Sequence, residues 1–132
     1  MHWYQPLLWL WASPATLLGL LPAPIVLCQG GTIRVVRRVV EIEGGIVTRF
    51  LQRGLPWVGG GAAMTLGHVV WGRNLQSLSD ARDHEHVHVR QYERWGPFFI
   101  PAYLLASLLV KLRGKHPYWD NPFEREAYDE AP

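Results

Sequence analysis

A chain of 132 residues with 13 basic and 11 acidic side chains is long enough for one domain and too short for two. Its net charge of +2 offers no basic surface for nucleic acid, and its single cysteine excludes an internal disulfide framework. Hydrophobic residues make up 48% of the chain and charged residues 18%, a balance that excludes intrinsic disorder for most of it.

The first predicted element is a hydrophobic segment at the N-terminus. Leu7–Cys28 contains no charged residue, and a continuous helix of this length would be long enough to cross a bilayer. The prolines within it predict a kink in the middle and an early end of the helix. Three interpretations of this segment are open: a cleaved signal peptide, a membrane anchor, and an apolar helix that covers the core of the domain.

We interpret residues 1–30 as a membrane anchor and residues 31–132 as the domain that it carries. A signal peptide is disfavoured because no Lys or Arg precedes the apolar stretch. Basic residues follow the segment at once, at Arg34, Arg37 and Arg38. If the segment spans a membrane, the positive-inside rule therefore predicts that the domain lies in the cytoplasm, with membrane lipid as a partner.

Strand-like sequence follows the hydrophobic segment. Thr32–Glu43 is rich in β-branched residues, and the Gly-Gly pair after it predicts a two-residue hairpin to a partner strand over Ile46–Gln52. The glycine-rich stretch Gly54–Gly61 lacks the Lys-Ser/Thr ending of a phosphate-binding loop, so we interpret it as a connector. Ala62–Gly72 predicts a further strand. We therefore expect a small antiparallel sheet.

The residues that indicate chemistry lie on a predicted helix, Ser77–Arg94, which begins at a capping residue and ends before a Gly-Pro pair. Its histidines satisfy the pattern His-Glu-x-x-His. Positions four apart share one helix face, so His84 and His88 can bind one metal ion. Glu85 lies beside them, placed to act as a general base on a water that the metal activates. Zn²⁺ suits such a site.

Other interpretations of this segment stay open. In a strand, His84, His86 and His88 would share one face and form a metal site without a catalytic glutamate. A surface helix that binds no metal is a further alternative. In the helical interpretation His86 faces away from the other two, as a supporting or surface group. An extended motif with a third histidine ligand is excluded, because Gln91 and Arg94 occupy the positions of its glycine and histidine.

Catalytic zinc needs a third protein ligand and an open fourth position. A short C-terminal helix, Pro122–Tyr128, offers two carboxylates after a good capping signal. We favour Glu124, because it shares a helix face with Tyr128, whereas Glu126 points elsewhere. Glu126, His116 and the absence of a third ligand are the alternatives.

Between the two metal-binding segments lies Phe98–Leu112, which is apolar almost all round. Its length is short for a bilayer span, so we expect a core helix behind the active-site helix or a helix in the membrane interface. Lys111, Arg113 and Lys115 suit both a helix C-terminus and lipid head groups.

Taken together, Asp83–Pro97, Ala63–Val70 and Asn121–Tyr128 resemble a small uncharacterised bacterial membrane-associated family. More broadly they resemble gluzincin-type metallopeptidases, which place a strand bordering the substrate cleft before a His-Glu-x-x-His helix and a glutamate ligand after it. The resemblance implies an α+β, zincin-like minidomain: a small antiparallel sheet, the active-site helix, the apolar helix and a short C-terminal helix. It also implies that the protein is located at the inner membrane of a bacterium.

The same resemblance implies hydrolysis of peptide bonds in a peptide or protein substrate. Zn²⁺ would be held by His84, His88 and Glu124, with Glu85 as the general base. Possible accessory residues are His68, Glu126 and Tyr128. We keep two alternatives: a non-catalytic membrane protein that binds zinc for a structural or sensing role, and an interaction module whose histidines bind no metal.

Overall fold

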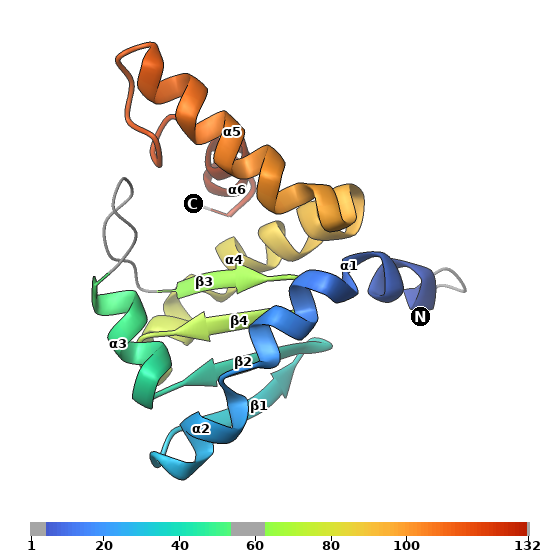
Figure 1. Ribbon diagram of the computed structural model, residues 1–132, viewed down its shortest axis with the longest axis vertical. Coiled ribbons are helices and arrows are strands. Elements are labelled where there is room, and N and C mark those ends of the chain that lie inside the picture. The colour runs from blue at the N-terminus through green and yellow to red at the C-terminus, as the bar shows by residue number, and fades with distance from the viewer. Residues whose placement is uncertain (1–4, 54–62, 132) are drawn as a thin grey trace.

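The computed structural model describes residues 5–53 and 63–131 of the chain. They form an α+β fold in which helices cover both faces of a four-stranded sheet (Figure 1). The elements are α1 (Gln5–Leu20), α2 (Ala23–Cys28), β1 (Thr32–Val36), β2 (Val39–Glu43), α3 (Gly45–Arg53), β3 (Ala63–Leu66), β4 (Val69–Gly72), α4 (Leu75–Trp95), a 3₁₀ turn (Gly96–Phe98), α5 (Phe99–Leu112) and α6 (Pro122–Glu130). The predicted connector Gly54–Gly61 lies outside the described residues.

The sheet is mixed, so the expectation of an antiparallel sheet is wrong. Its strand order is β1-β2-β4-β3. The neighbours β1 and β2 are antiparallel, as are β3 and β4, whereas β2 and β4 run parallel. A parallel pair needs a crossover connection, and the chain between β2 and β4, which includes α3, supplies it.

The first hairpin turns at Arg37-Arg38 and not at the Gly-Gly pair. Within the predicted strand Thr32–Glu43, β1 pairs with β2 from Thr32 opposite Glu43 onward. Arg37 and Arg38 both have left-handed backbone conformations, with φ of 52° and 67°. Arginine is not a residue that favours this conformation, so the sequence contained no signal for a turn at this point.

A helix, α3, occupies the place of the predicted strand Ile46–Gln52. Val47 and Leu51 lie four positions apart, and both are buried against the sheet. This spacing is typical of an amphipathic helix. The side chain of Thr48 accepts a hydrogen bond from the backbone N–H of Gly44 and donates one to the carbonyl of Arg73, which fixes the start of the helix.

The predicted single strand Ala62–Gly72 is a hairpin of two short strands, β3 and β4. Its turn consists of Gly67 and His68, and Gly67 has a φ of 62°, which glycine adopts without strain. Apolar residues continue on both sides of this turn. The composition therefore resembles one uninterrupted strand.

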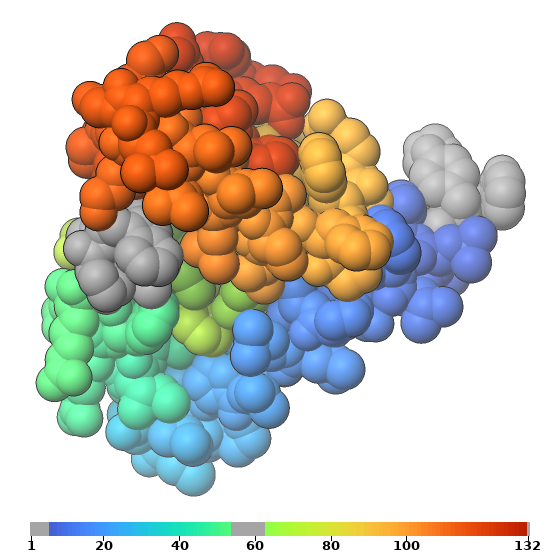
Figure 2. Space-filling view, turned by 45° about the horizontal axis from the view of Figure 1, so that its top comes forward, coloured from blue at the N-terminus to red at the C-terminus, as the bar shows by residue number. Residues whose placement is uncertain are grey.

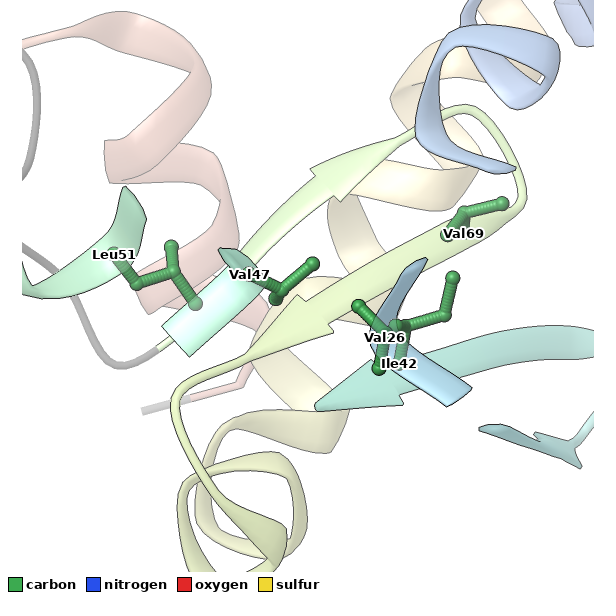
Figure 3. Packing of buried hydrophobic residues seen from close by; sticks show 5 residues of the cluster. All are labelled: Val26, Ile42, Val47, Leu51 and Val69. Carbon is green, nitrogen blue, oxygen red and sulfur yellow. The ribbon is translucent and has the colours of Figure 1, made fainter. Parts of the chain in front are cut away.

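The core has one layer on each side of the sheet. On one side, residues from α2, α3, β2 and β4 pack together (Figure 3): Val26, Ile42, Val47, Leu51 and Val69. On the other side, α4 packs against the sheet through Leu78 and Val89. The close approach of α4 depends on Gly72, where a Cβ atom would overlap the side chain of Leu78. Burial of apolar residues on both faces stabilises the sheet, and the sheet in turn supports α4.

The N-terminal helix α1 packs on the sheet and on the C-terminal end of α4. Pro14 lies inside it, so the helix continues past this proline. Ala12 and Ala15 are buried. The carbonyl of Gly19 accepts a hydrogen bond from the indole of Trp71 at 2.8 Å. The hydrophobic segment thus contributes to the folded domain along one of its sides.

Large apolar side chains on α1, α2 and α5 nevertheless face outward. On the N-terminal helices and the turn between them, residues more than half exposed include Leu7, Leu10, Leu17, Leu21 and Leu27; on α5, the exposed leucines are Leu104, Leu105, Leu108, Leu109 and Leu112. Figure 2 shows α5 (orange) and the N-terminal helices (blue) at the surface on the same side of the molecule. Two helical stretches, Pro6–Cys28 and Leu75–Leu112, are long and apolar enough to cross a membrane.

Candidate metal centre

The motif lies on α4, which crosses one face of the sheet (Figure 1). The helix begins two residues before the predicted cap at Ser77, because the side chain of Asn74 accepts a hydrogen bond from the backbone N–H of Ser77 at 2.7 Å. It ends at Trp95, before Gly96 with its φ of 58°. The helical interpretation of the histidines is confirmed, and the strand interpretation is wrong.

The structure brings the three predicted ligands to one point. Glu124 on α6 places its Oε1 atom 3.0 Å from Nε2 of His84 and 3.0 Å from Nε2 of His88. The predicted cap of α6 is present, since the side chain of Asn121 accepts a hydrogen bond from the backbone N–H of Phe123. All three ligand side chains lie in the interior, with side-chain exposures of 12% for His84 and 6% for the other two.

Glu85 lies beside the ligands and is also buried. Its Oε2 atom is 3.6 Å from Nε2 of His84, and its Oε1 atom accepts a hydrogen bond from the hydroxyl of Thr65 at 3.3 Å. Ligand atoms of His84, Glu85 and His88 all lie within 4.8 Å of one another, so this buried group could hold a metal ion. Thr65 belongs to β3, and the sheet thereby orients the carboxylate of Glu85.

A second layer of side chains orients the ligands. Nδ1 of His88 donates to Oε1 of Gln91 at 2.8 Å, which leaves Nε2 of His88 to act as a ligand. The amide nitrogen of Gln91 donates to the carbonyl of Phe123 and to Glu126, so the orientation of this buried amide is fixed. The hydroxyl of Tyr103 on α5 donates to Oε2 of Glu124 at 2.6 Å.

Sequence reasoning missed the roles of Gln91 and Tyr103. Gln91 follows His88 by three positions on the same helix, and this spacing was an available signal for a side-chain contact. Tyr103 lies on another helix, 21 residues away from Glu124. Its contact depends on how α5 packs, so no local pattern indicates it.

The electrostatics of the group follow from burial and from these hydrogen bonds. Burial opposes the charged form of Glu124, but hydrogen bonds from His84 and His88 outweigh it and lower the pKa of Glu124 to about 2. Burial likewise opposes the charged form of His88, but the hydrogen bond to Glu124, the negative charges of Glu85 and Glu124 and the hydrogen bond to Gln91 together outweigh it and raise the pKa of His88 to about 9. Burial raises the pKa of Glu85 above the usual carboxyl range, which makes its carboxylate a stronger base.

The accessory candidates on α6 have different surroundings. Glu126 accepts hydrogen bonds from Gln91 and Arg94, and thus contacts the centre through Gln91. The ring of Tyr128 lies against the ring of His84, with 4.2 Å between centroids. The hydroxyl of Tyr128 is hydrogen-bonded to that of Tyr118 at 3.0 Å. Tyr128 therefore packs against a ligand.

His68 and His86 both line a smaller cavity, and His86 also lines the cavity that the predicted ligands border. Nε2 of His68 lies 2.9 Å from the carboxylate of Glu93. His86 is buried, and its Nε2 atom has no hydrogen-bond partner among the described residues. These contacts place His68 in an interaction with Glu93 and not with the ligand group.

The residues present fit a zinc ion. Two imidazole nitrogens and a carboxylate oxygen are a known donor set for catalytic zinc, and here His84, His88 and Glu124 present these atoms to one another in the protein interior. Nδ1 of His84 is buried without a partner among the described residues. A cavity of about 1550 Å³ borders the group and is lined by His84, Glu85, His88 and Glu124. A fourth coordination position could therefore face open space.

Comparisons of the chain with protein-family models, with curated proteins and with solved structures found no match. The family resemblance of the motif segments therefore stays a prediction. What the fold and the side chains define is an α+β domain with a buried His-Glu-x-x-His group completed by a glutamate from a second helix. Function is inferred from this group.

Proposed function

We propose that the chain is a membrane-associated zinc metallopeptidase that hydrolyses peptide bonds. The observation that carries this proposal is the position of Glu124, whose Oε1 atom lies 3.0 Å from Nε2 of both His84 and His88, next to the buried carboxylate of Glu85. Zinc bound by such a donor set polarises a carbonyl group and lowers the pKa of water to about 7.

In this proposal one side chain of the centre transfers a proton, and the others position the reacting groups. Glu85 accepts the proton of the attacking water and passes it to the leaving nitrogen. Its raised pKa suits this role, and the hydroxyl of Thr65 holds its Oε1 atom in place. Gln91 fixes the ring of His88, and Tyr103 fixes the second oxygen of Glu124. Preorganised groups of this kind lower the cost of reaching the transition state.

The surroundings of the centre offer room for a peptide. The cavity beside the ligands is lined by Thr65 and Leu66 of β3 on one side and by Tyr103 of α5 on the other. β3 is an edge strand of the sheet, and an edge strand can pair with an extended chain through its free backbone groups. The substrate class supported by this arrangement is an extended peptide or protein segment.

Membrane association is supported by the outward-facing leucines of the N-terminal helices and α5. Burial of exposed apolar surface of this kind in lipid is favourable. Lys111, Arg113 and Lys115 at the end of α5 are exposed and would meet anionic head groups. Together with Arg34, they support a domain on the cytoplasmic side of a bacterial inner membrane.

The test compares Glu85→Gln with Glu124→Gln in the full chain, purified in a non-ionic detergent without a histidine tag. Zinc content is measured by mass spectrometry, and activity by the cleavage of quenched fluorescent peptide libraries. Glu85→Gln should retain zinc and lose activity by about 10²- to 10⁴-fold. Glu124→Gln should lose zinc because a ligand is removed. Asp129→Asn, at an exposed carboxylate on α6 that does not line the cavity, is the matched control and should do neither.

The outcomes separate the proposal from its alternatives. Unchanged activity in Glu85→Gln would refute the enzymatic role. Stoichiometric zinc in the wild type without cleavage of any peptide would support the non-catalytic zinc-binding role instead. Absence of zinc from the wild type, even after zinc is supplied, would support an interaction module.

A further inference from the structure

A second cavity, of about 380 Å³, lies beside α4 and shares Arg37, His86 and Arg90 with the lining of the larger cavity at the ligands. Its lining includes His86, which is about 200° around the helix from His84. Basic side chains surround it: Arg37 and Arg38 come from the turn between β1 and β2, and Arg90 comes from α4. Segments that are far apart in the sequence thus bring positive charge to one small space.

The wall of this cavity contains an unsatisfied polar atom. His86 is only 9% exposed, and its buried Nε2 atom has no hydrogen-bond partner among the described residues. Leaving a buried polar group unpaired is unfavourable, and most such groups in native proteins have a partner. A partner for this atom would have to enter the wall of the cavity beside the arginines.

The arginines of the turn occupy a conformation that is unfavourable for them. Arg37 and Arg38 have φ values of 52° and 67°, in a two-residue turn where Asn and Gly are preferred. Backbone strain of this kind is often retained at binding sites. Arg37 forms an ion pair with Asp83 at 2.9 Å, whereas Arg38 has no hydrogen-bond or ion-pair partner within residues 5–53 and 63–131. The guanidinium group of Arg38 is therefore available to a ligand.

The lining contains three arginines and one acidic side chain, Glu93. Glu93 is in contact with Nε2 of His68 at 2.9 Å. Arg90 forms an ion pair with Glu130 at 3.0 Å, and both of these side chains are about half exposed. An exposed pair of this kind is weak, so Arg90 can turn to an anion in the cavity at little cost.

We propose that this cavity binds a phosphate group, held by the guanidinium groups of Arg38 and Arg90 next to the ring of His86. The planar, multiply donating guanidinium group matches the oxygens of phosphate. Trp9 of α1, which is 41% exposed, also lines the cavity. The cavity thus adjoins the helix that carries Leu7 and Leu10 on its outer side. The phosphate belongs either to a lipid head group or to a free phosphate compound.

The test uses the full chain in a phosphate-free, non-ionic detergent. Binding of inorganic phosphate is measured by titration calorimetry. Binding to vesicles is measured by co-sedimentation, with phosphatidylcholine alone and with phosphatidic acid added. The test variant is Arg38→Gln combined with Arg90→Gln. The control variant removes the same charge from α3, by Arg49→Gln combined with Arg53→Gln, at exposed arginines that do not line the cavity.

We expect the test variant to bind phosphate at least about tenfold more weakly than the wild type, because each charge-assisted hydrogen bond contributes a factor of this size. The control variant should bind as the wild type does. If the additional binding to phosphatidic acid falls in the same variant and free phosphate competes with it, the source is a lipid head group. If only the binding of free phosphate falls, the source is a soluble phosphate. Equal binding by the test and control variants in both assays would overturn the proposal.

A second variant separates binding from folding. Arg38→Gly places glycine at a φ of 67°, which glycine adopts without strain. Its melting temperature should equal or exceed that of the wild type, while its phosphate affinity falls. Unchanged phosphate affinity in this stable variant would also contradict the proposed role of Arg38.

Discussion

Tyr103→Phe tests whether the centre depends on α5 as well as on the motif helix. The substitution removes the hydroxyl that donates to Oε2 of Glu124 at 2.6 Å. The remaining ring keeps its neighbours, since Phe99 and Phe123 lie about Tyr103 with centroid distances of 5.9 and 6.2 Å. The change therefore affects the orientation of the Glu124 carboxylate and leaves the apolar packing in place.

The expected magnitude follows from the kind of contact that is lost. A hydrogen bond to a charged group contributes about 1.5–3 kcal/mol, and loss of a side chain that orients a metal ligand lowers metal affinity by about 10- to 100-fold. We therefore expect Tyr103→Phe to lower the zinc affinity by this factor. The assay is competition for zinc against a coloured chelator, with zinc content and circular dichroism measured on the same sample.

Tyr118→Phe is the matched control for this prediction. It removes a hydroxyl that is hydrogen-bonded to the hydroxyl of Tyr128 and to no predicted ligand. Its zinc affinity should stay within about threefold of the wild type, a difference below 1 kcal/mol. A Tyr103→Phe variant that keeps the affinity of the wild type would refute the positioning role of Tyr103. An equal loss in both variants would do so as well.

Two further predictions concern the placement of α4 and the removal of metal. Gly72→Ala should lower the free energy of unfolding by about 1–3 kcal/mol through overpacking against Leu78; an unchanged midpoint of thermal unfolding would contradict the close approach. In the metal-free protein, folding lowers the pKa of Glu124 and raises the pKa of His88, so the contact between them stabilises the fold most between about pH 4.5 and 6.5. The free energy of unfolding then falls as the pH rises toward about 9, because His88 loses its proton. The loss of melting temperature on chelation should therefore be larger at pH ~9 than at pH ~6, and a pH-independent loss would refute this linkage.

Much of the centre could be predicted because its signals are local. The spacing of His84 and His88 and the capping of α6 are patterns within a few residues, and they placed these side chains and Glu124 on helices that meet. The surroundings of the ligands are not local. The contact of Tyr103 depends on the packing of α5, and that of Thr65 depends on the end of a strand 20 residues before Glu85.

The strands were harder to predict than the helices for a physical reason. Turn signals depend on residues that favour left-handed backbone, and the first hairpin turns at Arg37-Arg38, which do not. The Gly-Gly pair that follows β2 marks instead the beginning of α3. In α3, the buried pair Val47 and Leu51 has helical spacing, but β-branched composition favoured a strand over so short a segment. Topology then followed from tertiary packing, which sequence patterns do not contain.

The helix α5 connects the proposed membrane surface to the metal centre. Phe99, Tyr103 and Ser107 lie four positions apart and form its inner side, whereas its leucines face outward. Through this inner side α5 holds α6, because Ser107 accepts a hydrogen bond from the buried side chain of Asn121 at 2.8 Å and Tyr103 bonds to Glu124. The position of the third ligand is thus set by a helix whose outer surface is apolar and exposed. If lipid covers this surface as proposed, it would also fix the helix that orients Glu124, and the proposed membrane association and the proposed metal centre would then depend on the same element.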